Sequence, residues 1–288
     1  MSSTHEKWDL VIKPKNKWYH LDLGALWKYK DLMLLLVRRD SVSLYKQTLL
    51  GPLWFFIQPI FTIVIYYFMF GRIANISTDG KPALLFYMSG LVCWNYFSEC
   101  LNNTSGVFIN YAGIFGKVYF PRLIVPVASV FSAGIKFFIQ LLLFFILLVY
   151  YTLYQHTFSL QISWHVILIP FLIIATGIIG MSFGLIISAM TTKYRDLKNL
   201  VGYAMQLGLY ITPIIYPLQW LKIKLPLFYK ICLFNPLVSV VETFKYVFLG
   251  SGTFDPILVI YTFVFTVCLF FVAVIFFNKV EKTFVDTV

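Results

Sequence analysis

Charged residues are scarce in this chain. They make up 12% of its 288 residues, while 60% are hydrophobic; a soluble domain carries roughly 25% charged residues. This composition excludes an ordinary globular domain, and the chain is too long to be a single membrane anchor. The net charge of +11 is spread among apolar blocks, which disfavours a nucleic-acid-binding protein. The composition therefore predicts an all-α polytopic membrane protein without a large soluble domain.

Motifs for covalent and nucleotide chemistry are also missing. The sequence has no HExxH, no GxSxG and no DxD pair, and the fragment closest to a Walker A motif, residues 79–82, lacks the upstream glycine and the following Ser or Thr. The four cysteines form no CxxC pair and have no histidines at metal-ligand spacing. We therefore expect no enzyme activity, no cofactor and no metal site in this chain. A membrane-embedded glycan-modifying enzyme would need a cluster of acid, base or metal ligands that the sequence does not contain.

Long apolar runs are what the chain does have. A bilayer core of about 30 Å requires about 20 apolar residues per helix. We predict six spans, at residues 51–70, 83–104, 124–151, 165–190, 200–217 and 256–277. Six spans place both termini on one side, and most lysines and arginines outside the spans then fall on that side. The positive-inside rule therefore predicts that both termini are cytoplasmic.

One segment within the N-terminal region 1–50 is expected to lie on the membrane surface. Residues 22–40 are too charged to span, but their apolar residues recur at helical spacing, which predicts an interfacial amphipathic helix. A cytosolic helix packed on a partner is the alternative. Six residues fall at helical spacing on one face, and four of them are aliphatic: Leu23, Leu26, Trp27, Lys30, Leu34 and Val37.

Another segment, residues 218–250, contains no uncharged run long enough to cross a bilayer and is broken by Asn235-Pro236. Bent backbone at membrane depth is tolerated only where it is buried in protein or lines a cavity. We therefore predict a re-entrant helical pair, with a seventh span as the alternative. Glu242 and Lys245, three residues apart on its second half, are predicted to pair with each other.

Two ionisable residues fall inside predicted spans. Glu99 lies toward the inner end of the second span and Lys136 near the middle of the third. A charge at mid-bilayer costs roughly 2.5–3.5 kcal/mol on the insertion scale, so each should face protein or water. Consecutive spans run antiparallel, and the two side chains can therefore meet. We favour a structural ion pair over the alternative, a transport or proton-relay role.

Aromatic residues gather in the first three spans. Sugar rings stack on aromatic faces, so a subset of these residues is a candidate lining for a glycan path; an interfacial aromatic belt and ordinary helix packing are the alternative for each single residue. The candidates are Tyr66, Tyr67, Phe70, Tyr87, Trp94, Tyr96 and Phe97.

Four motifs carry a family resemblance. YKQTLLGPLWFFIQPIF (45–61), GKVYFPRLIVPVAS (116–129), TTKYRDLKNLVGYAMQLGLYITPIIYP (191–217) and FNPLVSVVETFKYVFLG (234–250) follow one another in the order found in ABC-2 type permeases of polysaccharide export. The chain resembles most closely the Wzm/TagG subgroup, which exports O-antigen and teichoic acid. The resemblance covers nearly the whole chain from about residue 40.

The resemblance implies an architecture and partners. It implies an ABC-2 transmembrane domain over 51–288, with a coupling helix within 106–122 and re-entrant helices before the sixth span. It also implies a homodimer in the bacterial cytoplasmic (inner) membrane that works with two copies of a separate ATPase, similar to Wzt or TagH, which would hold the ATP and Mg. The substrate class implied is a lipid-diphosphate-linked polysaccharide, either O-antigen, a capsule-like glycan or teichoic acid. Export of a drug or a small lipid is the alternative within the same superfamily.

The resemblance also places candidate site residues. Those expected at the ATPase contact or the inner gate are Lys117, Tyr119, Pro121, Arg122, Tyr194, Arg195 and Asp196. Those expected to attract the substrate diphosphate are Arg38, Arg39 and Lys46, because arginine and lysine bind phosphate groups and anionic headgroups. Anchoring to anionic lipid is the alternative for this second group.

Arg195 generates a prediction. Its guanidinium can hold a carboxylate or phosphate bidentately, so we expect Arg195→Ala to leave membrane insertion and dimerisation intact while ATP hydrolysis is uncoupled from export. ATPase activity and export measured in the same preparation check this. Normal export by the variant would mean that the charged segment around Arg195, residues 191–200, acts only as a signal for membrane topology.

Overall fold

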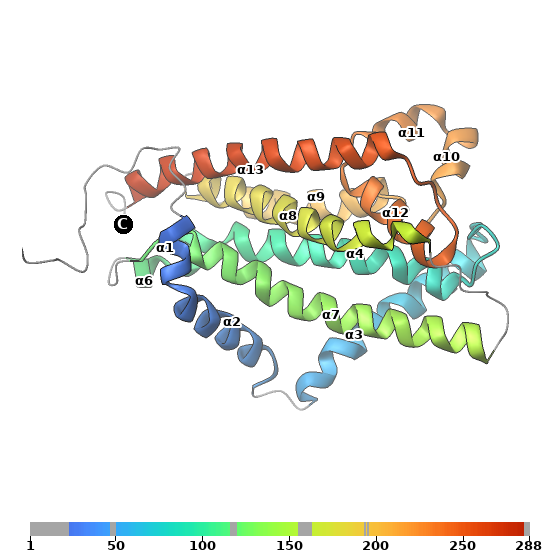
Figure 1. The fold of residues 1–288 in the computed structure, drawn as a ribbon, viewed down its shortest axis with the longest axis horizontal. Helices are drawn as coiled ribbons and strands as arrows, with labels where there is room; N and C mark the ends of the chain where they lie inside the picture. The colour runs from blue at the N-terminus through green and yellow to red at the C-terminus, as the bar shows by residue number, and fades with distance from the viewer. Residues whose placement is uncertain are drawn as a thin grey trace, which may run out of the picture.

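The computed structural model describes residues 23–46, 50–115, 120–154, 163–192, 194 and 196–284, and every regular element within these ranges is helical. The all-α prediction is confirmed. Figure 1 shows α4, α7, α8 and α13 running roughly along one direction, with α10 and α11 at one end of the molecule and α1 and α6 at the other.

The first half of the chain contributes two long helices and several short elements. In order they are α1 (Leu23–Lys28), α2 (Lys30–Tyr45), η1 (Gly51–Leu53), α3 (Trp54–Tyr66) with its π-helical continuation η2 (Tyr67–Ile73), α4 (Ala83–Ser105), α5 (Val107–Asn110), α6 (Ala112–Phe115) and α7 (Ile124–Leu153). The second half contains η3 (Trp164–Leu168), α8 (Ile169–Thr191), α9 (Leu197–Ile211), α10 (Leu218–Lys224), α11 (Pro226–Leu233), α12 (Leu237–Leu249) and α13 (Pro256–Phe284).

Four helical segments in the described part of the chain are long and apolar enough to cross a membrane: 54–73, 124–153, 164–191 and 256–280. A fifth is reached if α11 and α12, which bend by 99° at a short break, count as one span. The break lies at Phe234–Pro236, where the sequence predicted it. The predicted count of six spans therefore includes two helices, α4 and α9, that fall short by length or composition.

Helix α4 is polar for a span because protein, rather than lipid, surrounds it. It packs against α7, α8 and α12, and most of its side chains from Leu85 to Thr104 are buried. A polar side chain in such a helix faces other helices or a cavity, so the usual penalty for contact with hydrocarbon does not apply. The low hydropathy of α4 follows from its central position.

The helix found at the predicted span 200–217 has other bounds and is shorter than predicted. Helix α9 begins at Leu197, covers 15 residues and ends at Ile211, which gives a length of about 22 Å against a bilayer core of about 30 Å. It ends because Thr212 precedes Pro213 and takes the extended conformation that proline imposes on its neighbour. None of the residues of α9 is buried.

A helix is present at the predicted N-terminal position, and part of it packs on the bundle. The helix breaks at Tyr29 into α1 and α2, and α2 packs along α7 with Leu36 buried. Trp27 and Leu34, assigned to the same face as Leu26 and Val37, are instead exposed, whereas Leu26 and Val37 pack on the core. One side of the helix contacts the bundle and a second apolar side stays uncovered.

Close contact between α4 and α8 holds the centre of the bundle together. Gly177, Gly180 and Gly184 line one side of α8. A β-carbon built at Gly180 would lie 2.7 Å from the Cβ of Cys100 and 2.8 Å from the carbonyl oxygen of Phe97. Small residues let the two backbones approach this closely, as is common between helices in membranes.

Gly180→Ala is therefore expected to force α4 and α8 apart and to lower the free energy of unfolding by about 1–3 kcal/mol. The matched control is Gly134→Ala on α7, where a β-carbon would meet nothing within 4 Å; replacing this helical glycine should be neutral or stabilising by up to about 1 kcal/mol. Thermal unfolding of the two variants in detergent distinguishes them. Equal melting temperatures would show that the α4–α8 spacing adjusts freely.

Candidate functional site

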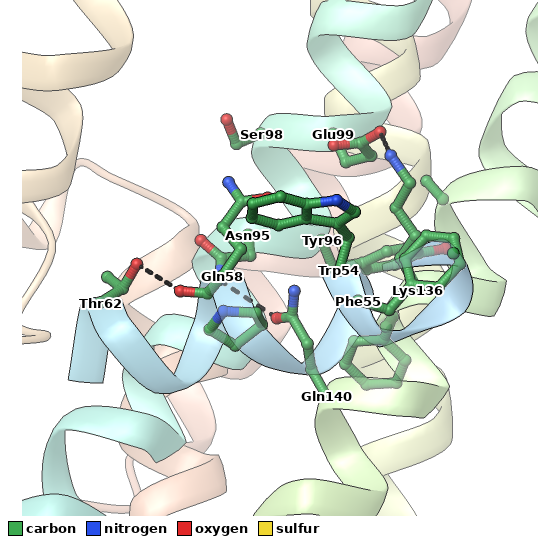
Figure 2. A pocket seen from close by; sticks show the side chains of 14 residues that line it. Trp54, Phe55, Gln58, Thr62, Asn95, Tyr96, Ser98, Glu99, Lys136 and Gln140 are labelled. Atoms are coloured by element: carbon green, nitrogen blue, oxygen red, sulfur yellow. Dashed lines mark hydrogen bonds and ion pairs between the residues drawn. The ribbon is translucent and has the colours of Figure 1, made fainter. Parts of the chain in front are cut away.

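A cavity of about 410 Å³ lies between α3, α4 and α7 (Figure 2). Small-molecule sites commonly have volumes of about 300–1,000 Å³. Helix α3 lines it with Trp54, Phe55, Gln58 and Thr62. Helix α4 contributes Asn95, Tyr96, Ser98 and Glu99. Helix α7 contributes Ala133, Lys136, Phe137 and Gln140. Polar and aromatic side chains from three helices thus face one space.

The two ionisable residues predicted inside spans meet in this cavity. The Lys136 Nζ donates to the Glu99 carboxylate, so the predicted ion pair is confirmed. Asn103, one turn further along α4, donates to the same carboxylate at 3.1 Å. The Lys136 and Glu99 side chains are 24% and 31% exposed. The pair neutralises its own charge while remaining in contact with the cavity.

Amide side chains extend the polar lining. The Asn95 Nδ2 donates to the Gln140 Oε1 at 3.1 Å, which connects α4 with α7. On α3 the Thr62 hydroxyl donates to the backbone carbonyl of Gln58 at 3.0 Å. These bonds leave the second amide hydrogen of Asn95 and both hydrogens of Gln140 available to a ligand or to water.

The sequence analysis missed most of this lining, although a signal for it exists. Polar pairs four residues apart recur in three consecutive apolar segments: Gln58 with Thr62, Asn95 with Glu99, and Lys136 with Gln140. Residues four apart share one helix face, so each pair marks a polar face on a membrane helix. The sequence does not show that the three faces meet, because that depends on how α3, α4 and α7 are rotated.

Four of the seven aromatic candidates for a glycan path are buried among the helices of this chain. Tyr87, Trp94, Tyr96 and Phe97 belong to the main hydrophobic cluster, and only Tyr96 lines the cavity. The other three are partly exposed on α3 and η2: Tyr66, Tyr67 and Phe70. Helix packing accounts for the buried residues, whose faces are covered by protein in this conformation.

The basic residues in the middle and at the end of α2 differ in their surroundings. Arg38 and Lys46 are exposed. Arg39 is held by Asp40, at 2.7 Å from Nη2 to Oδ1, and it also donates to the Tyr111 hydroxyl, with its guanidinium carbon 5.0 Å from the ring centre. Burial raises the pKa of Tyr111, so its phenol is neutral at physiological pH. Arg39 thereby connects α2 to the turn between α5 and α6.

Among the residues expected at the ATPase contact, Lys117, Tyr119 and Arg195 lie outside the described part of the chain. Pro121 and Arg122 precede α7 and are partly buried. Tyr194 is 53% exposed, and Asp196 stands at the N-terminus of α9, where a negative charge is favoured by the helix dipole. Their positions follow α6 and α8, at the end of the bundle that also carries α1 (Figure 1).

Glu242 and Lys245 are both fully buried on α12, but the structure gives them partners other than each other. The Lys245 Nζ donates to the Pro213 carbonyl and lies 3.7 Å from the centre of the Phe86 ring. The Glu242 Oε2 accepts from the backbone N–H of Thr253 at 3.0 Å. The predicted pairing therefore holds only as an attraction between two nearby charges, because the hydrogen bonds of the two side chains attach α12 to different segments. Bends at both ends of α12 bring these segments close, which residue spacing along one helix does not reveal.

The described residues contain no group of three or more His, Cys, Asp or Glu side chains placed to hold a metal ion. The helices and the cavity define the class of the molecule: a multi-pass helical membrane protein whose polar groups are enclosed between its membrane helices.

Comparison with known proteins gives the family. Residues 31–249 match the family described as ABC-2 type transporter, and the chain belongs to this family. It is 29% identical over 267 residues to a Klebsiella pneumoniae protein named O-antigen export system permease protein RfbA, covering 92% of this chain and 96% of the relative. A second Klebsiella pneumoniae protein of that name is 28% identical over 268 residues, with the same coverage. A Myxococcus xanthus protein of the same name is 25% identical over 223 residues, which is 77% of this chain and 82% of the relative.

The Glu99–Lys136 pair generates a stability prediction. Removing one partner of a fully buried pair costs about 3–5 kcal/mol, and solvent at this partly exposed pair should reduce the loss for Lys136→Met to about 1–2 kcal/mol. The double variant Glu99→Gln/Lys136→Met leaves no unpaired charge and should recover most of the loss. A double-mutant cycle on the melting temperature in detergent measures the coupling. Strictly additive effects would mean that the pair contributes nothing to stability.

Proposed function

We propose that this chain is the transmembrane permease subunit of an ATP-driven ABC exporter that moves lipid-linked polysaccharide of the O-antigen type across the bacterial inner membrane. The observation that carries the proposal is the near end-to-end similarity to two proteins named O-antigen export permeases, which covers 92% of this chain and 96% of each relative. Similarity restricted to a short segment would support only a shared fold; here no large segment of either chain lacks a counterpart.

The energy for export would come from a separate ATPase. The chain has no Walker A motif, and ATP binding therefore belongs to a partner, of which we propose two copies on a homodimer of this chain. An exposed apolar surface on α9 supports the homodimer, because a second copy would cover it: the side chains are Leu200, Tyr203, Leu207 and Tyr210. The bias of Lys and Arg supports cytoplasmic termini.

A mechanical connection from the ATPase side supports the coupling part of the proposal. Arg39 joins α2 to Tyr111, and Tyr111 lies six residues before Lys117, the first residue expected to meet the ATPase. Movement of this segment during ATP binding would displace α2, which packs along α7. Arg38 in the middle of α2 and Lys46 at its end are both exposed and would attract the substrate diphosphate.

Deletion of the gene in a strain that still synthesises the polymer tests the function. We expect surface polysaccharide to disappear and long lipid-linked glycan to accumulate inside the cell, because synthesis continues while export stops. Lipid extraction and surface staining measure the two pools, and the wild-type gene supplied in trans should restore export. Normal surface polymer with no accumulation would contradict the proposal and point to another cargo of an ABC-2 exporter, such as a drug or a small lipid.

A further inference from the structure

We propose that the cavity between α3, α4 and α7 is a binding subsite for an uncharged sugar residue of the exported glycan. This inference rests on the proposed function, since it assigns the part of the substrate that the cavity takes. The cavity brings together the three features that a sugar ring requires: hydrogen-bonding groups of both kinds, an accessible aromatic face and no net charge.

The charge of the cavity favours a sugar over the diphosphate. Its two ionised side chains, Glu99 and Lys136, neutralise each other. A diphosphate brought into this space would gain one lysine that is already paired and would meet a carboxylate at the same place. A neutral hydroxyl group suffers no such repulsion and can accept from the ammonium or donate to the carboxylate.

The hydrogen-bonding groups of the cavity have capacity left for a ligand. Gln140 keeps both amide hydrogens free while its oxygen accepts from Asn95. Gln58 lines the cavity and is exposed. Its side-chain amide forms no hydrogen bond with another described side chain or backbone group. Each sugar hydroxyl both donates and accepts, as the amide groups do.

Trp54 provides the aromatic face. The residue is 47% exposed, and in Figure 2 its indole lies across the cavity near Asn95 and Glu99. The C–H groups on one side of a pyranose carry partial positive charge and are attracted to the negative face of an aromatic ring. Tyr96 and Phe137 are the buried aromatics of the lining. A sugar on the indole would place its hydroxyls toward the amides.

The test measures binding to the purified complex of permease and ATPase in nanodiscs. The probe is the lipid-free polysaccharide released by mild acid from the cell's own lipid-linked polymer, titrated by calorimetry. Trp54→Leu and Gln140→Leu should each weaken binding roughly two- to twelve-fold, since each removes one stacking or hydrogen-bonding contact. The matched controls, Trp164→Leu on η3 and Gln219→Leu on α10, change exposed residues outside the cavity and should bind as the wild type does.

Inorganic diphosphate, added as a competitor, tests whether the cavity binds a phosphate group instead of a sugar. The same nanodiscs without polymer give the background signal. The inference fails if the two cavity variants bind like the wild type, if diphosphate competes with the polymer, or if the wild-type complex binds no polymer. Trp54 is at the exposed rim, so Trp54→Leu keeps the test valid if Gln140→Leu does not fold. Export assays on the same strains separate the two proposals. If the deletion strain does not export polymer while the cavity variants export it normally, the subsite is refuted and the proposed function stands.

Discussion

The close contact of α4 with α8 is the constraint on which the rest of the structure depends. Glycines on α8 let the backbones meet where any side chain would collide, and α7 and α12 cover the other sides of α4. Surrounded in this way, α4 can carry Asn95 and Glu99 without exposing them to lipid. A cavity with polar walls inside an apolar bundle follows from that protection.

The cavity and the N-terminal helix belong to one mechanical unit. Helix α2 packs along α7, which supplies Lys136 and Gln140. The next described element after α2 is η1, which leads into α3 with Trp54 at its first turn. Gly51, where the chain changes direction with φ of +52°, lines the cavity itself. Helix α2 thus contacts elements of two of the three cavity walls, so the proposed coupling to an ATPase and access to the cavity would share the same elements.

Prediction from sequence succeeded where one residue property decides the outcome. The apolar runs located all the long helices, and Pro236 marked the break between α11 and α12. Glu99 and Lys136 could be paired because unpaired charges in a bilayer are costly and consecutive spans are antiparallel. Spacing along one helix was a poorer guide for Glu242 and Lys245: their charges attract each other, but the bend supplies the Pro213 carbonyl and the Thr253 N–H as their hydrogen-bond partners.

The sequence by itself determined that the chain is helical, that it belongs in a membrane and which segments are apolar, because hydrophobicity and helix length are local properties that the bilayer selects directly. Only the tertiary structure decided which helix is central and which polar faces meet. Those outcomes depend on the rotation and close approach of helices far apart in the chain. Asn95 and Gln140 lie 45 residues apart and become partners because glycine contacts fix α4 in the centre and α7 packs beside it.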